Sequence, residues 1–181
     1  MNAEELRQRY AAGERDFSVA DLRQATMEGI DLSGAVLHGA MLDGANLRRA
    51  KLREANLSGA ALKDADLTQA DLSGADLSDA ILDGAVLEGA NLEGAILDQA
   101  DLKAANLARA ALTHADLTDA DLEAADLSGA DLETADLQEA NLSQAELERA
   151  NLEGANLKGA KLEEANLDGT VLEGEDSTLI S

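Results

Sequence analysis

The sequence lacks cysteine, proline and tryptophan, and its 181 residues include a single tyrosine and a single phenylalanine. Without cysteine there are no disulfides, thiolate nucleophiles or cysteine-ligated metals. Without proline, almost every backbone N–H remains available as a hydrogen-bond donor. Compact globular domains commonly fill an irregular interior with large rings. The scarcity of rings therefore indicates a core of another kind, built from the abundant leucine and alanine.

Basic residues are also few, since 14 Lys and Arg face 37 Asp and Glu, for a net charge of −23. This charge argues against direct binding to nucleic acid or to anionic lipid. No stretch approaches the length of a membrane span. Residues 1–13 are charged where a signal peptide would be apolar. We therefore expect a cytoplasmic protein that does not contact nucleic acid or membranes directly.

An uninterrupted five-residue repeat fills residues 15–174. Of its 32 units, 30 have Leu at the third position and 29 have Ala at the first. In an α-helix a five-residue repeat advances about 140° beyond a full turn, so the leucines would spiral around every side. In an extended segment, the first and third positions point to the same side and the second points away. Fourteen of the fifteen glycines occupy the fifth position, which favours a corner there.

The pattern A-(D/N)-L-x-x over residues 15–174 resembles that of the pentapeptide-repeat family. The resemblance implies an all-β solenoid, a right-handed quadrilateral parallel β-helix in which four repeats make one coil. Thirty-two repeats would then make about eight coils, or a rod roughly 38 Å long at ~4.8 Å per coil. Third-position side chains would form four internal columns, one running from Phe17 through Leu37 to Leu157 in steps of twenty.

Residues 1–14 are predicted to form an N-terminal capping helix. Asn2 is a candidate N-cap, and Glu5 follows three residues later, as in a capping box. We expect a short amphipathic helix over residues 3–12 that ends at Gly13 and lies on the first coil.

The C-terminal tail, residues 175–181, is too short for a stable covering helix. Two predictions stay open for this end of the solenoid. Leu179 and Ile180 fold back over the last coil, or the last coil meets its copy in a homodimer. The family resemblance is consistent with the second prediction, because some members dimerise through their C-terminal coils, and an open strand edge is a physical motive for it.

Residues twenty apart become neighbours on an outer face of such a solenoid. By this register Met41, Ala61 and Ile81 form a contiguous apolar stripe, and Val36 and Val86 lie across adjacent corners. In the family this outward position is usually Asp or Asn, so these residues are departures from its pattern. One interpretation is that apolar and β-branched side chains suit an exposed strand. The other is a partner-binding patch.

Charged side chains make two further surfaces in this register. An alternating series predicts an ion-pair ladder between coils: Arg23, Asp43, Lys63, Asp83, Lys103 and Glu123. Carboxylates without an intervening base stack on two other faces: Glu133, Glu153 and Glu173 on one, and Asp116, Asp119, Asp136 and Glu139 on the other. Like charges ~5 Å apart repel, so these surfaces cost stability unless they are screened or used.

The acidic surface has two interpretations. It is a solvated surface that keeps the protein soluble, or it mimics DNA. The resemblance implies the second, because some pentapeptide-repeat proteins bind DNA gyrase in place of duplex and protect it from quinolones. The net charge of −20 over residues 15–174 gives one charge per ~1.9 Å, against ~1.7 Å for B-DNA. A basic second coil, with Arg48, Arg49, Lys51 and Arg53, argues against uniform mimicry.

No catalytic residue, cofactor or metal site is predicted. His38 and His114 fall on different faces, and the outward Ser and Thr residues are expected to have no histidine beside them, so no nucleophile–base pair forms. A convex rod also lacks a concave pocket for a small substrate. The sequence therefore predicts a non-enzymatic structural or interaction module that presents flat charged β-faces to an unidentified protein partner. The alternative is an acidic DNA mimic that binds DNA gyrase.

Overall fold

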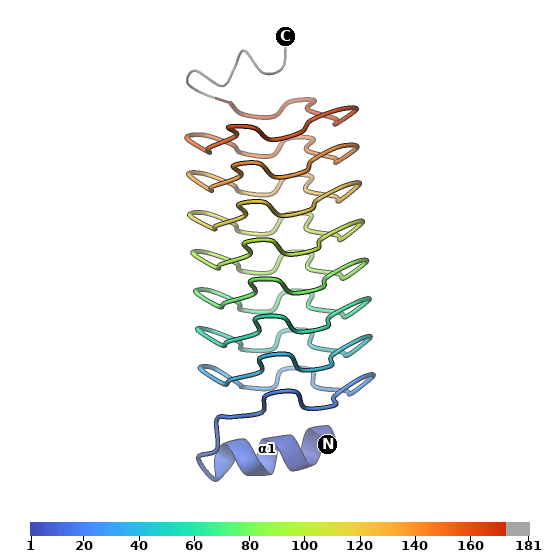
Figure 1. The fold of residues 1–181 in the computed structure, drawn as a ribbon, viewed down its shortest axis with the longest axis vertical. Helices are drawn as coiled ribbons and strands as arrows, with labels where there is room; N and C mark the ends of the chain where they lie inside the picture. The colour runs from blue at the N-terminus through green and yellow to red at the C-terminus, as the bar shows by residue number, and fades with distance from the viewer. Residues whose placement is uncertain (173–181) are drawn as a thin grey trace.

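The computed structural model describes residues 1–172. One α-helix, α1 (Ala3–Ala11), precedes a stack of coils that continues through the rest of the described chain (Figure 1). Each repeat contributes a single residue, at its second position, to parallel β-bridges. Every bridge joins residues twenty apart, from Asp16–Val36 to Asn151–Val171. The predicted β-helix solenoid is confirmed, and residues twenty apart lie on adjacent coils.

The four bridge positions of each coil define four outer faces, which also include the fourth and fifth positions that follow each bridge residue. Their bridge residues are spaced by twenty and run as follows: face A from Asp16 to Asn156, face B from Asp21 to Lys161, face C from Thr26 to Asn166, and face D from Asp31 to Val171.

Backbone hydrogen bonds repeat from coil to coil. The Leu37 N–H donates to the carbonyl of Asn56 at 2.7 Å, and the Gly39 N–H donates to that of Ser58 at 2.9 Å. Within the repeat, the Ala40 N–H donates to the Leu37 carbonyl at 2.9 Å and closes a turn. The third residue of this turn is the fifth position, and it has a positive φ in every repeat from residue 19 to 169, as a type II turn requires. Eighteen of these residues are not glycine, so the cross-coil bonds impose the corner against side-chain preference.

Asp and Asn side chains at the second position complete each turn. All twenty of them accept a hydrogen bond from the N–H of the fourth-position residue. Asn56 Oδ1, for example, accepts from the Ser58 N–H at 3.0 Å. This Asx turn is the physical reason for Asp or Asn at that position. An apolar residue there, such as Ile81, cannot supply the acceptor.

The core consists of stacked leucine and alanine. The predicted column from Phe17 to Leu157 is buried along its whole length, and the first-position alanines from Ala35 to Ala155 fill the space beside the leucines. No polar or charged side chain in residues 1–172 is buried. Each coil therefore contributes a similar apolar layer and packs only on its neighbours, as in other solenoids.

Helix α1 lies across the N-terminal end of the stack in Figure 1. Asn2 Oδ1 accepts from the Glu5 N–H at 2.8 Å, as its position before the helix predicts. Leu6 is completely buried against the core, and the Tyr10 hydroxyl donates to the Ser33 carbonyl at 2.8 Å. The helix ends at Ala11, one residue earlier than predicted, and Gly13 follows with φ 98°.

Several predicted features lie outside the described residues. They are Glu173, the tail of residues 175–181, and Leu179 and Ile180 within it. In the part that is described, nothing helical could span a bilayer, because no helix has the necessary length and apolar character.

Candidate functional site

The apolar stripe on face B has the neighbours that the register predicts. Bridges join Met41 to Ala61 and Ala61 to Ile81. Ile81 is 46% exposed, whereas Met41 and Ala61 are half-buried. Val36 lies on face A and Val86 on face C, both partly buried. The structure thus brings three of the five residues into one column and places the two valines on the flanking faces.

The predicted ion-pair ladder beside this stripe is mostly wrong. Of its steps, only the Lys63–Asp83 ion pair forms between coils. Arg23 instead binds Asp21 at 2.7 Å within its own repeat. This hydrogen-bonded pair lowers the pKa of Asp21 to about 2.

Lys103 also departs from the predicted ladder, since it forms an ion pair with Asp121 at 2.9 Å instead of with Asp83 or Glu123. In both departures the partner is a second-position aspartate. That carboxylate projects beside the fourth-position cation, so it competes with the fourth-position carboxylate on the next coil.

The predicted acidic residues stack as expected in the described chain. A bridge joins Asp116 to Asp136 on face A, and Asp119 and Glu139 occupy the following corner of the same two coils. Both corner side chains are exposed. On face D the exposed Glu133 lies one coil below Glu153.

The acidic surface on face A extends over more coils than the residues predicted from the sequence. Three further carboxylates lie on the two preceding coils of the same face, and none of the seven forms an ion pair within residues 1–172. Face A carries no lysine or arginine between residues 16 and 139, a signal that reading the sequence in steps of twenty would have revealed. We call this set the acidic face: Asp76, Asp79, Asp98, Asp116, Asp119, Asp136 and Glu139.

An exposed isoleucine lies within the acidic face. Ile96 is 42% exposed, and bridges place it between Asp76 and Asp116. Asp98 follows it two residues later on the same coil. The surface therefore combines uncompensated carboxylates with an apolar contact point.

The basic second coil shows the opposite arrangement, because three of its four cations form ion pairs and Arg49 donates to Gln69 Oε1. Ion pairs join this coil to its neighbours above and below: Arg48 to Asp66 at 3.1 Å, Lys51 to Asp31 at 3.7 Å and Arg53 to Asp71 at 3.7 Å. These cations neutralise aspartates on both adjacent coils and do not form a separate basic patch.

The expectation that no histidine lies beside a Ser or Thr hydroxyl is wrong. His38 Nδ1 lies 2.9 Å from Ser58 Oγ on the next coil, and His114 Nδ1 contacts Thr134 Oγ1. Both pairs are twenty residues apart, so the register contained the signal. Ser58 Oγ already donates its only hydrogen to Asn56 Oδ1 at 2.6 Å, so His38 Nδ1 must be the donor to Ser58. A histidine that donates to the hydroxyl is not placed to remove its proton.

Potential metal ligands do not cluster in the described chain. No three His, Asp or Glu side chains within residues 1–172 gather as a metal site would need.

The fold, with its outward Asx turns and inward leucines, defines a β-solenoid of five-residue repeats. The model for pentapeptide repeats matches eight copies, over residues 16–53, 30–69, 62–99, 70–107, 95–133 and 135–174. The chain belongs to the pentapeptide-repeat family, and this membership implies a right-handed β-helix.

Solved structures of family members resemble the chain over most of its length. HetL, a protein involved in heterocyst differentiation regulation in Nostoc sp. strain PCC 7120, is 36% identical, with 95% of this chain and 97% of HetL covered and a TM-score of 0.40. A trypsin-treated variant of QnrB1, a plasmid-mediated fluoroquinolone resistance protein, is 16% identical, with 91% of each chain covered and a TM-score of 0.62. The likeness to QnrB1 concerns the fold alone. Comparison with curated proteins gave no match.

Proposed function

We propose that this protein is a non-enzymatic interaction module whose acidic face binds a basic segment of a partner protein. On this proposal the scaffold is a quadrilateral β-helix of about eight coils over residues 15–174. Residues 1–14 close its N-terminal end, and the protein acts in the cytoplasm. The solenoid supplies a rigid flat surface, and the outward side chains supply the recognition.

The observation that supports this function is the set of seven carboxylates without a counter-ion on four successive coils of face A. Like charges directly opposite each other on neighbouring strands destabilise a sheet. Ordinary soluble surfaces intersperse both signs of charge, as the second coil of this chain does. A partner that brings cations to the acidic face would remove the repulsion, so the repulsion itself favours binding.

Ile96 narrows the chemistry of the partner. A segment of Lys and Arg residues would pair with the carboxylates, and an apolar side chain within that segment would cover the exposed isoleucine. Backbone hydrogen bonds from coil to coil hold the face rigid, so little conformational entropy is lost on the side of this protein. Association through such a surface is expected to be fast and to weaken as salt rises.

The proposal is tested by affinity capture from the native organism with two charge-matched variants. The face variant replaces Asp98, Asp116, Asp119 and Asp136 by Asn, which preserves the Asx turns at residues 116 and 136. The control variant replaces four aspartates that form ion pairs, Asp31, Asp66, Asp71 and Asp121, by Asn. We expect partners to be lost from the face variant alone. Partners retained by it would contradict the proposal.

The apolar stripe on face B is a separate proposed contact, tested in the same experiment with Ile81→Asp. Loss of the captured proteins would place the stripe in the interface. Their retention would leave Ile81 as an exposed strand residue with no role in binding.

A second candidate function, a DNA mimic that binds DNA gyrase, is favoured by charge density. Residues 75–172 carry a net charge of −17. Spread over five rungs, about 24 Å, this is one charge per ~1.4 Å, denser than the ~1.7 Å of B-DNA. A gyrase supercoiling assay with and without quinolone tests the idea. If the protein at micromolar concentration neither inhibits gyrase nor protects it from quinolone, the DNA-mimic function is excluded.

Dimerisation through the last coil is a further proposal. Leu162 and Leu167 are only partly buried, unlike the leucines of earlier coils. Light scattering at high protein concentration tests it, and a monomeric mass would contradict it.

A further inference from the structure

One corner of the solenoid differs in charge from the other three. The fifth-position column that follows face C contains no carboxylate, and each of the other three columns contains at least one in the described chain. All three fifth-position arginines of residues 19–169 fall on this corner. Its sequence from coil to coil is Gly29, Arg49, Gln69, Gly89, Arg109, Gly129, Arg149 and Gly169.

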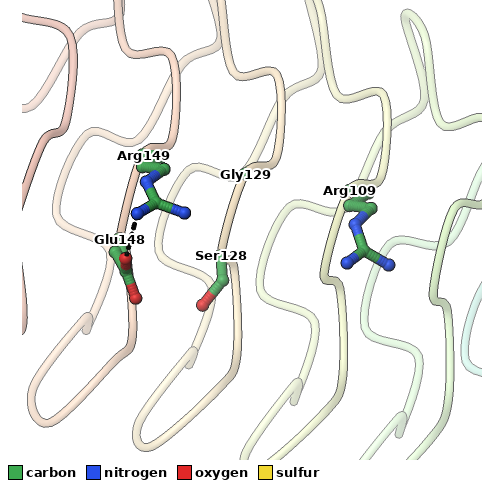
Figure 2. A pocket seen from close by; sticks show the side chains of 5 residues that line it. All are labelled: Arg109, Ser128, Gly129, Glu148 and Arg149. Atoms are coloured by element: carbon green, nitrogen blue, oxygen red, sulfur yellow. Dashed lines mark ion pairs between the residues drawn. The ribbon is translucent and has the colours of Figure 1, made fainter.

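A notch of about 200 Å³ lies on this corner where Gly129 separates two of the arginines. Its lining residues come from three successive coils (Figure 2): Arg109, Ser128, Gly129, Glu148 and Arg149. A Cβ atom added at Gly129 would lie 3.8 Å from Arg109 Cγ. The glycine therefore leaves open the space between the arginines that a longer side chain would fill.

The backbone fixes the spacing of the two arginines. The Arg109 N–H donates to the Ser128 carbonyl at 3.0 Å, and the Gly129 N–H donates to the Glu148 carbonyl at 2.8 Å. Arg109 and Arg149 are thus two rungs apart, or about 9.6 Å. Both have positive φ, 58° and 59°, a conformation that disfavours residues other than glycine. Two long side chains at this spacing can converge on one ligand above Gly129.

Ser128 adds a hydroxyl between them. Its N–H donates to Asp126 Oδ1 at 2.9 Å, as in other repeats, but its hydroxyl forms no hydrogen bond within residues 1–172. The hydroxyls of Ser73 and Ser78, by contrast, donate to the aspartate of their own repeat at 2.7 and 2.6 Å. The Ser128 hydroxyl is therefore available to a ligand in the notch.

The two arginines are held only weakly by carboxylates. Arg109 pairs with Glu88 at 3.0 Å and Arg149 with Glu148 at 3.3 Å, and the arginine side chains remain 77% and 80% exposed. Exposed pairs of this kind contribute little and are screened by salt. A guanidinium also carries five N–H donors, so it can bind a second oxyanion without releasing the first.

We propose that the notch over Gly129 binds a phosphoryl group. Arg109 and Arg149 donate to its oxygens from opposite sides, and the Ser128 hydroxyl donates from a third direction. Three donors around one point match a tetrahedral group with several oxygens better than a planar carboxylate with two. The group comes either from free phosphate or from a phosphorylated side chain of a partner. This site is separate from the acidic face and does not depend on it.

The test follows the arginine side-chain Nε–Hε resonances of the full chain by NMR during titration with inorganic phosphate at constant ionic strength. We expect saturable shifts at Arg109 and Arg149 and none at Arg49, which lies on the same corner outside the notch. Arg109→Gln and Arg149→Gln should each weaken binding about tenfold, because each removes a charge-assisted interaction. Gln69 has positive φ on the same corner, so these variants are expected to fold.

Two controls complete the experiment. Arg49→Gln should leave phosphate affinity unchanged, and Gly129→Gln should abolish binding by filling the notch. A second titration uses a phosphoserine peptide, and tighter binding of the peptide than of phosphate identifies a phosphorylated partner as the source. Equal affinities identify free phosphate. Shifts of equal size at Arg49, or unchanged affinity in both arginine variants, would overturn the proposal.

Discussion

The first three coils and the remaining coils share one backbone and one core but differ in surface charge. Residues 15–74 contain nine acidic and seven basic residues, whereas residues 75–172 contain 22 acidic and five basic ones. Five of the seven cations of the first part bind aspartates, four of them on adjacent coils, as Arg48 binds Asp66. Most carboxylates of the second part have no such partner among the described residues. The inner positions thus determine the fold, and the outer positions vary without changing it.

Hydrogen bonds and ion pairs lower the pKa of carboxylates in both parts. A hydrogen-bonded arginine lowers the pKa of Asp21 to about 2, and hydrogen bonds from Ser33 lower the pKa of Asp31 below its ordinary value. Both residues lie in the first coil. In the second part, despite desolvation, the hydrogen bond from Lys103 lowers the pKa of Asp121, but residues 75–172 contain only five cations for 22 carboxylates.

The largest effect is expected from a charge in the core, and it should be equal in the two parts. Leu57 and Leu97 are both completely buried. Leu57→Lys and Leu97→Lys should each cost about 3–5 kcal/mol, because a buried charge has no counter-ion there. Urea denaturation measures the loss, with Leu97→Met as a control that should cost less than about 1.5 kcal/mol. An unchanged melting temperature for Leu97→Lys would contradict the stacked core.

Fifth-position substitutions should come next, at about 1–2 kcal/mol. Gly94 has φ 62° and open space around an added Cβ, so Gly94→Ala should destabilise through backbone conformation alone. Ala124, with φ 57°, should respond in the opposite direction, and Ala124→Gly should stabilise. Thermal denaturation of both variants measures the effect. If both substitutions changed the melting temperature in the same direction, the corners would not need the left-handed conformation.

Replacing aspartate by asparagine should distinguish the two parts, with effects of up to about 1 kcal/mol. Asp116→Asn keeps an acceptor for the Thr118 N–H and removes repulsion, so it should stabilise. Asp66→Asn removes the ion pair with Arg48 and should destabilise. Equal changes in the midpoint of urea denaturation would show that the charge difference between the two parts has no energetic consequence.

The smallest effect is expected from pH. The pKa of Asp21 is lowered from 3.8 to about 2 by its hydrogen bond with Arg23. Its charge therefore stabilises the fold above about pH 4, and this contribution is lost as pH falls through about 2. Wild type and Asp21→Asn should differ in stability at pH 6 and converge near pH 2, measured by circular dichroism during urea denaturation. A constant difference down to pH 2 would contradict the assignment.

The five-residue period was sufficient to predict the burial of Phe17 and Leu97 and the contact between Met41 and Ala61. These features depend only on register, which an array without insertions preserves. The pairing of Arg23 with Asp21 was not predictable in this way, because it depends on which of two nearby carboxylates a flexible side chain reaches.

Other features of the surface needed the register to be applied more widely, or needed the structure itself. The contact of His38 with Ser58 was within reach of the same twenty-residue step, as was the extension of the acidic face to Asp76. The notch exists because Gly129 has no side chain, and its proposed ligand depends on the orientation of the Ser128 hydroxyl; the repeat pattern specifies neither.

The most direct test of the acidic face as the binding surface is calorimetric titration of the captured partner. The wild type, the face variant and the control variant are each titrated at low and at physiological salt. The account predicts a large loss of affinity and a weaker salt dependence for the face variant, with the control variant close to wild type. Equal affinities for the two variants would show that overall charge, rather than the acidic face, governs binding.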